Sequence, residues 1–240
     1  MENIIQKISS ILSLIIIFCV TAVFYFEYKG FDYVDGKIIF KAPTAEAAEQ
    51  RSFATVLDGN IVINASQKYA LGSINAPLTL YEYSSLGCPH CSEFHLDVLP
   101  KIKKEYVDSG LLRVIFVNFP LDKKSMKAAM ISECMTYENY FGFLNRLFDR
   151  QRFWFMDNTD DDLFKFAAEY GLTYDETKAC MNDNTIAQDI VSNRQEALTR
   201  LQVQGTPAFL IRGADGNEII YGAPSYHQMK EYLDSRLMRY

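Results

Sequence analysis

Two cysteines separated by two residues, Cys88 and Cys91, are the part of this sequence best suited to chemistry. Such a pair can form a redox-active disulfide, or it can supply half of a zinc site. Pro89 suits the first turn of a helix, where its missing N–H would have no partner. A cysteine at the start of a helix faces free N–H groups and the positive end of the helix dipole, which favour its thiolate. We therefore predict that Cys88 attacks and that Cys91, one turn along, resolves the mixed disulfide.

The residue between Pro89 and Cys91 is a histidine. A protonated His90 beside Cys88 would stabilise the thiolate further, and the alternative is an exposed loop residue without a role. Glu82 is also unusual, because it interrupts the apolar strand expected at residues 78–84. A buried carboxylate is costly unless it is protonated or paired. Near Cys91 it could take and return the thiol proton; the alternative is an edge-strand glutamate that points to solvent.

Thr206 and Pro207 lie just before another expected strand. Only an X–Pro bond adopts the cis form at modest cost, so we expect a cis bond here, with a trans, strand-initiating proline as the alternative.

The apolar run at residues 11–26 follows the cation Lys7. It is long for the apolar part of a signal peptide and slightly short for a membrane span. Small residues at 20–22 offer a cleavage site, but the run stays apolar and bulky beyond them. We expect residues 1–26 to be a signal anchor or a removed signal peptide, with a buried core helix as the third alternative. Both leading interpretations export the rest of the chain to an oxidising compartment.

Export bears on the other cysteines. In an exported protein, Cys134 and Cys180 are expected to form a structural disulfide. The alternative joins them with Cys88 and Cys91 in one zinc site. Cys19 lies in the apolar run and is most simply a small hydrophobic residue.

The composition fits a folded domain: 49% of the 240 residues are hydrophobic and the net charge is -6. This balance, without a long basic run, argues against nucleic acid as the main partner. His95 and His227 are interpreted as helix-surface residues without a metal-binding pattern, and we expect neither a metal nor a cofactor.

The pattern along the chain predicts a mixed α/β domain with a helical block inside it. Residues 27–59 are a connecting region that contains a hairpin at 31–40, turning at Asp35-Gly36, and a helix or stalk after Pro43. A strand, a helix and a strand then form a parallel crossover. The predicted strands are 61–63, 78–84, 111–119, 207–211 and 218–221; the predicted helices are 89–108 with a bend near Pro100, several between 123 and 201, and a last one from Ser225.

Taken together, EYSSLGCPHC, FVNFPL and GTPAFLI resemble the DsbA-type thiol–disulfide oxidoreductases of the thioredoxin superfamily over about residues 60–240. The resemblance implies a thioredoxin fold, formed by residues 60–122 and 203–240, with a helical insert at 123–202 and the hydrophobic helix before it.

The resemblance also implies roles for the residues singled out above. Cys88 is then the attacking cysteine, Cys91 the resolving cysteine, Glu82 the buried acid, and Thr206-Pro207 the cis-proline loop that binds substrate in extended form. The implied partners are reduced exported proteins in the periplasm and a DsbB-like membrane oxidase. Thr206 replaces the valine of the best-known CPHC oxidase and also occurs in isomerases of the family. An isomerase or reductase of the same fold is therefore the first alternative function, and a non-catalytic module that holds a metal is the second.

Overall fold

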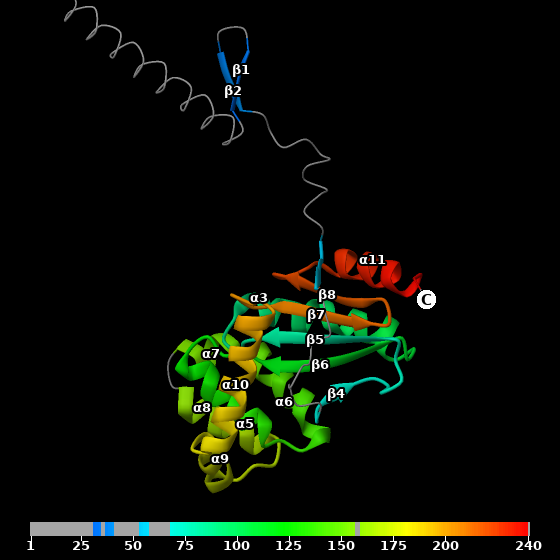
Figure 1. Ribbon diagram of the computed structural model, residues 1–240. Coiled ribbons are helices and arrows are strands. Elements are labelled where there is room, and N and C mark those ends of the chain that lie inside the picture. Colours follow the sequence, from blue (N-terminus) through cyan, green and yellow to red (C-terminus); the bar gives the residue numbers. More distant parts are fainter. Residues whose placement is uncertain (1–30, 35–36, 41–52, 58–67, 157–158, 240) are drawn as a thin grey trace, which may run out of the picture. The chain divides into compact units, whose positions relative to one another are not determined.

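The computed structural model describes residues 31–34, 37–40, 53–57, 68–156 and 159–239 (Figure 1). The chain divides into two compact units, residues 1–53 and 54–240. In the first unit, β1 (Phe31–Val34) pairs antiparallel with β2 (Lys37–Phe40), which confirms the predicted hairpin. The apolar run, Cys19, the segment after Pro43 and the predicted strand at 61–63 lie outside the described residues. Within the described part, no helix has the length and apolar character needed to cross a membrane.

Among the described residues, the second unit contains a six-stranded sheet in which one neighbouring pair, β5 and β6, is parallel and the other pairs are antiparallel. This pair confirms the predicted parallel crossover. The strands in sheet order are β3 (Thr55–Leu57), β8 (Gly216–Tyr221), β7 (Ala208–Gly213), β5 (Leu78–Ser84), β6 (Leu112–Asn118) and β4 (Ala70–Leu71). One boundary was wrong: β3, placed in the connecting region above, belongs to the sheet because its backbone pairs with β8.

The crossover from β5 to β6 is one helical segment with two π-turns. It runs through α3 (Pro89–Glu93), the π-helix η1 (Phe94–Val98), α4 (Leu99–Ile102) and the π-helix η2 (Lys103–Val107). Pro100 lies in the first turn of α4. Because proline has no N–H, the ordinary helical bond to the carbonyl four residues earlier cannot form there. The wider turn of η1 directly precedes this position, where the sequence predicted a bend.

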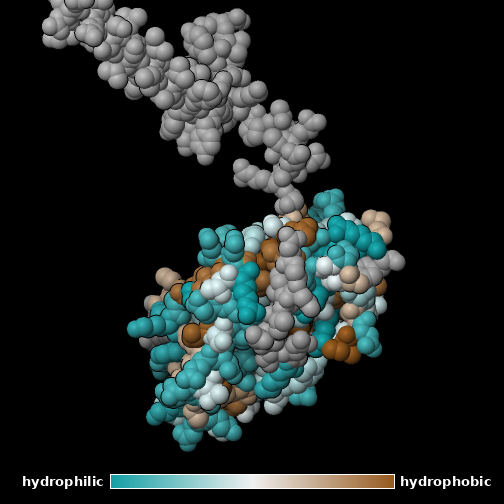
Figure 2. All heavy atoms as spheres, in the orientation of Figure 1, coloured by the Kyte–Doolittle hydropathy of each residue, from teal (hydrophilic) through white to brown (hydrophobic). Residues whose placement is uncertain are grey.

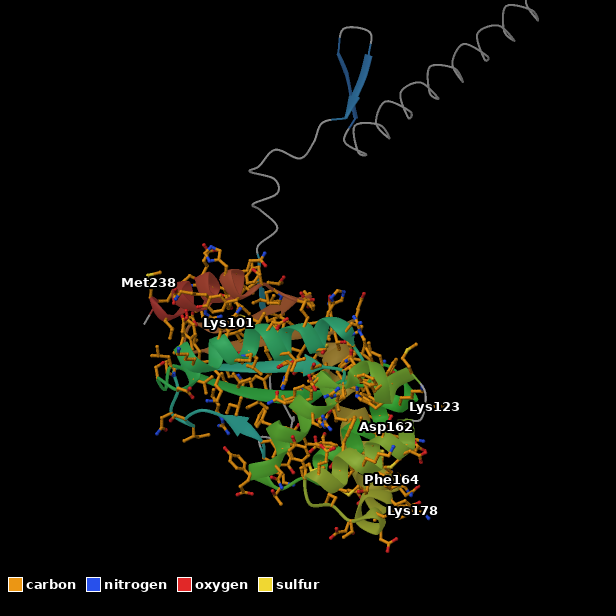
Figure 3. The ribbon with its side chains drawn as sticks, turned by 180° about the vertical axis from the view of Figure 1, so that it is seen from behind. Lys101, Lys123, Asp162, Phe164, Lys178 and Met238 are labelled. Atoms are coloured by element: carbon orange, nitrogen blue, oxygen red, sulfur yellow. A yellow bond between two sulfur atoms is a disulfide. The ribbon has the colours of Figure 1, made fainter. Side chains whose placement is uncertain are left out.

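The predicted helical block follows β6 (Figure 1). Its helices are α5 (Lys123–Glu133), α6 (Tyr137–Asp149), α7 (Gln151–Met156), α8 (Thr159–Glu169), α9 (Tyr174–Met181) and α10 (Asn184–Arg200). Side-chain caps fix three of the helix starts, at Asp122, Thr173 and Asp183. Seen from behind, the labelled Asp162, Phe164 and Lys178 lie on the outer side of the block (Figure 3).

Helices cover both faces of the central strand β5, and all but one of its residues are buried. Alternate residues of the strand therefore serve different cores. Leu78 and Leu80 pack with the crossover helix and with α11 (Tyr226–Leu237), whereas Tyr81 and Tyr83 join a cluster that includes Ala197 of α10. A third cluster fills the helical block and reaches the cysteine pair. The face of the second unit that Figure 2 shows is mostly hydrophilic, with apolar side chains interspersed.

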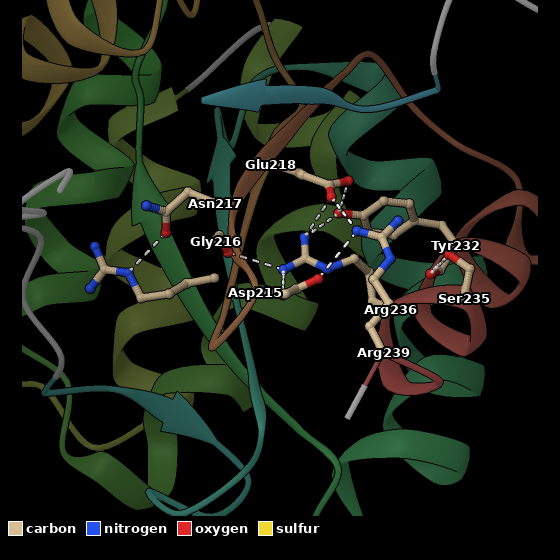
Figure 4. Close-up of polar contacts among 9 residues, drawn as sticks. Asp215, Gly216, Asn217, Glu218, Tyr232, Ser235, Arg236 and Arg239 are labelled. Carbon is tan, nitrogen blue, oxygen red and sulfur yellow. Dashed lines mark hydrogen bonds and ion pairs between the residues drawn. The ribbon is translucent and has the colours of Figure 1, made fainter. Parts of the chain in front are cut away.

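The last helix is tied to the β7–β8 turn by a buried charge network (Figure 4). The side chain of Arg236 is fully buried and donates to the carboxylate of Asp215 and, at 2.9 Å, to the Tyr232 hydroxyl. Its second carboxylate partner, Glu218, is 3.4 Å away, and Arg239 contacts both carboxylates. Buried charges are tolerated only when they are paired in this way.

Candidate active site

The two cysteines lie at the start of α3, as the sequence predicted. Cys88 is the N-cap residue in extended conformation, and Pro89 occupies the first turn. Both cysteines are buried, but Cys88 is 8% exposed and Cys91 is 0% exposed. The more accessible sulfur is thus the one at the helix end.

The environment drives the pKa values of the two thiols in opposite directions. The pKa of Cys88 is lowered to about 5, mainly because the Cys91 thiol donates a hydrogen bond to it, and burial only partly opposes this. The Thr206 side chain and the backbone N–H groups of Cys91 and His90 lower it further. Burial, followed by the nearby Cys88 sulfur, raises the pKa of Cys91. Cys88 is therefore suited to be the thiolate, and Cys91 to hold its proton.

The side chain of His90 is not among the largest contributions to this shift. Its imidazole is exposed and lies 3.7 Å from the carboxylate of Glu93, while its backbone N–H faces the Cys88 sulfur. The contribution at this position thus comes from the helix start.

The loop before β7 faces the cysteine pair. The bond between Thr206 and Pro207 is cis, and the Cys88 thiol donates to the Thr206 carbonyl at 3.3 Å. The loop also lines a groove of ≈ 440 Å³ with Gln204 and Tyr221. Thr206 therefore both lines the groove and contacts Cys88.

Glu82 lies on the central strand between β6 and β7 and is 0% exposed, so the solvent-facing alternative was wrong. Among the described residues, its ion-pair partner is His95, whose Nδ1 lies 3.9 Å from Oε2. The interpretation of His95 as a helix-surface residue was also wrong: it is 2% exposed, with its ring against Phe148. His227, by contrast, is exposed and pairs with Glu231. The spacing of His95, four residues after buried Cys91 on one helical segment, was the sequence signal for its burial.

A second residue that the sequence did not point to is Gln151, the first residue of α7. Its buried side-chain amide donates to the carbonyl of Leu86 at 2.7 Å and to that of Cys88 at 3.0 Å. The Ser92 hydroxyl makes a further tie, donating to the Phe148 carbonyl of α6 at 3.1 Å. The helical block thus fixes the backbone that presents Cys88.

We expect Gln151→Leu to raise the pKa of Cys88 by about one unit, equivalent to ~1.4 kcal/mol, because the helix start would no longer be held against the sulfur. The measurement is the pH titration of the thiolate's ultraviolet absorbance in the reduced protein. Gln195→Leu, at an exposed position on α10, is the matched control and should leave the titration unchanged. An unaltered midpoint in Gln151→Leu would remove the positioning role.

The remaining described cysteines are joined to each other. Cys134 at the end of α5 and Cys180 on α9 form a disulfide, with their Cα atoms 6.3 Å apart and 46 positions between them in sequence. In the chain-entropy model, closing such a loop stabilises the fold by roughly 3–4 kcal/mol. The four-cysteine zinc site was wrong, because two of the required sulfurs are bonded to each other.

Comparison with known proteins agrees with this geometry. Residues 64–235 match the family model described as Thioredoxin, and the chain therefore belongs to the thioredoxin family. The crystal structure of Wolbachia pipientis alpha-DsbA1 is 32% identical in sequence and superposes with a TM-score of 0.65, covering 72% of this chain and 92% of that one. BdbD from Bacillus subtilis shares the fold at 24% identity and a TM-score of 0.63, covering 76% of this chain and 98% of that one. Within the family, the chain is of the DsbA type.

Curated relatives carry related names. Disulfide bond formation protein D of Bacillus subtilis is 26% identical over 70% of this chain and 76% of its own length. A putative protein-disulfide oxidoreductase of Rickettsia typhi is 26% identical over 71% of this chain. The match spans only 63% of that relative's length and 52% of the Rickettsia felis relative's.

Proposed function

We propose that this chain is an exported thiol–disulfide oxidoreductase that introduces disulfides into exported proteins through Cys88 and Cys91. The observation that carries the proposal is the opposite shift of the two pKa values, with Cys88 lowered to about 5 and Cys91 raised. A disulfide is a strong oxidant when its reduced form is stabilised, and a Cys88 thiolate stabilises the reduced form.

The reaction begins when a substrate thiolate attacks the Cys88 sulfur of the enzyme disulfide. A bond forms between the substrate and Cys88, and the Cys91 sulfur leaves with the electron pair and takes up a proton. A second substrate thiolate then attacks the substrate sulfur of this mixed disulfide. Cys88 leaves as a thiolate, so the substrate has lost two electrons and the enzyme has become a dithiol.

Other residues of the site serve these steps. Glu82 is proposed to exchange the Cys91 proton, since burial disfavours a lasting thiolate at Cys91. The Thr206–Pro207 loop is proposed to hold the substrate backbone in extended form beside Cys88. Its Thr206 carbonyl already lies within 3.3 Å of the Cys88 sulfur.

The cycle needs a re-oxidant, and a DsbB-like membrane oxidase is the proposed partner. The proposed location is the periplasm, with the chain anchored in the inner membrane by residues 1–26 or released after their cleavage. The apolar run supports export. The Cys134–Cys180 disulfide supports an oxidising compartment.

The alternative is an isomerase or reductase that a partner keeps reduced, and Thr206 motivated it. The direction of the Cys88 shift supports the oxidase, because the Thr206 side chain contributes to lowering that pKa.

The direction of the reaction is tested by the thiol state of the pair in cells. We expect acid quenching, followed by alkylation with a bulky maleimide, to find Cys88 and Cys91 mostly as a disulfide. A Cys88→Ala/Cys91→Ala double variant gives the background from the other cysteines. A mostly reduced pair would overturn the oxidase and favour the isomerase.

A further inference from the structure

Two titratable side chains lie buried against each other behind the cysteine pair. Glu82 is 0% exposed and His95 is 2% exposed, and 3.9 Å separates the carboxylate from Nδ1. Neither carboxylate oxygen has a hydrogen-bond partner, and nor does Nδ1. Buried polar atoms are nearly always satisfied, and each exception calls for an explanation. The carboxylate and the imidazole lie within ion-pair distance of each other, so each is a partner at hand for the other.

Two backbone elements, the crossover helix and β5, place this pair near Cys91. His95 follows Cys91 by four residues on the crossover helix, and Ser84 follows Glu82 by two residues on the same face of β5. The Ser84 side chain lies close enough to the Cys91 sulfur to favour its thiolate. The spacing along these two elements thus brings Glu82 and His95 toward Cys91 beneath the helix start.

The walls of this site are otherwise apolar. The ring of His95 packs on Phe148 at 4.6 Å and edge-on against Phe116 at 6.0 Å, and both phenylalanines belong to the buried cluster that contains the cysteines. Tyr140 of α6 belongs to the same cluster: burial raises its pKa, Glu133 and Tyr69 add to this, and Glu82 makes a smaller contribution. A net charge on Glu82 alone is costly in such surroundings.

We propose that Glu82 and His95 act as one unit that shares a single proton, donating it to Cys91 when the disulfide opens and taking it back when the disulfide re-forms. The inference rests on the proposed function, in which Cys91 leaves as a thiolate. In the oxidised protein the unit carries the proton and has no net charge. When the proton moves to Cys91, the negative charge of the leaving sulfur passes to Glu82, and neutral His95 can donate its Nδ1–H to that carboxylate. Charge and protons therefore balance within the site.

The chain has three histidines, so nuclear magnetic resonance can test the unit directly. Histidine ¹⁵N shifts report protonation and tautomer, and they are measured across pH in the oxidised and reduced protein. We expect the His95 signals to differ between the two forms and to lose this difference in Glu82→Gln. His227, which is exposed on α11, should show no difference. Identical protonation and tautomer of His95 in both forms would overturn the proposal.

A double-mutant cycle supplies the kinetic test. We expect Glu82→Gln and His95→Gln each to slow reduction of the enzyme disulfide by a dithiol peptide by roughly 10²-fold, the lower end for a positioned proton donor. The double variant should be no slower than the slower single variant, because residues that act as a unit are not additive. If the double variant is slowed by the product of the two single effects, the proposal that Glu82 and His95 act as one unit is overturned. His227→Gln is the matched control.

The tests remain decisive in two adverse cases. If urea unfolding shows that His95→Gln does not fold, the resonance comparison of the parent and Glu82→Gln still decides. If the cellular pair is reduced, the proposed oxidase fails while the peptide-reduction cycle and the resonances still test the proton unit.

Discussion

Replacing Cys88 with serine is expected to abolish oxidation of a reduced model peptide. The hydroxyl cannot form the disulfide that accepts the substrate's electrons, and no other described cysteine can take its place. Cys91 is 0% exposed, and Cys134 and Cys180 are bonded to each other. The measurement is the rate of disulfide formation in the peptide with excess enzyme. Retained activity in Cys88→Ser would discard the assignment of the nucleophile.

Cys91→Ser is the matched variant. It keeps the Cys88 thiol and, when offered a disulfide-bonded peptide, should accumulate a mixed disulfide with release of one peptide thiol. The hydrogen bond from the Cys91 thiol is the largest contribution to the lowered pKa of Cys88, and this variant replaces that thiol with a hydroxyl. The alkylation rate of Cys88 therefore also reports how much the hydrogen bond lowers the pKa.

The pH dependence of the reduced protein follows from the same thiolate. The pKa of Cys88 is about 5 in the folded protein, below its ordinary value near 9. The Cys88 thiolate therefore stabilises the folded, reduced protein fully above pH 9, and this stabilisation is lost as the pH falls through about 5. The oxidised protein has no thiol at this position and lacks this dependence.

The second large effect is expected for Arg236→Met, which should destabilise the fold by about 3–5 kcal/mol. The substitution removes the buried one of the two cations that contact both Asp215 and Glu218. Arg239, the other cation, is half-exposed and still contacts both carboxylates, so we expect the cost at the lower end of this range. The measurement is the free energy of unfolding by urea.

Lys165→Met is the control, because Lys165 pairs with Asp162 at the surface and such pairs contribute about 0–1 kcal/mol. Burial acts to raise the pKa of Asp215, but Arg236 and, to a smaller extent, Arg239 together outweigh it and the net pKa is lowered. The Asp215 contribution is thus present above its ordinary pKa and is lost as the pH falls through the lowered value. The cost of Arg236→Met should therefore shrink in acid, and a constant cost would contradict the assigned pairing.

Much of the fold could be predicted because the pattern of apolar residues matches the burial. The strand at 78–84 is apolar on both faces, and the structure places it at the centre of the sheet with helices on each side. Spacing alone gave the helical block from residue 123 onward. The strand β3 was missed because three residues are too few to show an alternation of apolar and polar side chains. Its pairing with β8 holds it in the sheet.

The site was predicted where neighbours in sequence are neighbours in space, as for Cys88, Cys91 and Pro89. Glu82 was noticed because a carboxylate is out of place in an apolar strand. Gln151 could not be found in this way, because its contact with the Cys88 carbonyl joins residues 63 positions apart. The polar character of His95 suggested the helix surface, whereas its spacing of four residues from Cys91 places it on the buried face of the helix.

The disulfide between Cys134 and Cys180 must form in each newly synthesised copy, and disulfide formation is the reaction proposed for the mature protein. Until that bond closes, α5 and α9 are held together by packing alone. In the proposed oxidising compartment, the first copies must then obtain an oxidant from elsewhere, whereas later copies can be oxidised by those already complete.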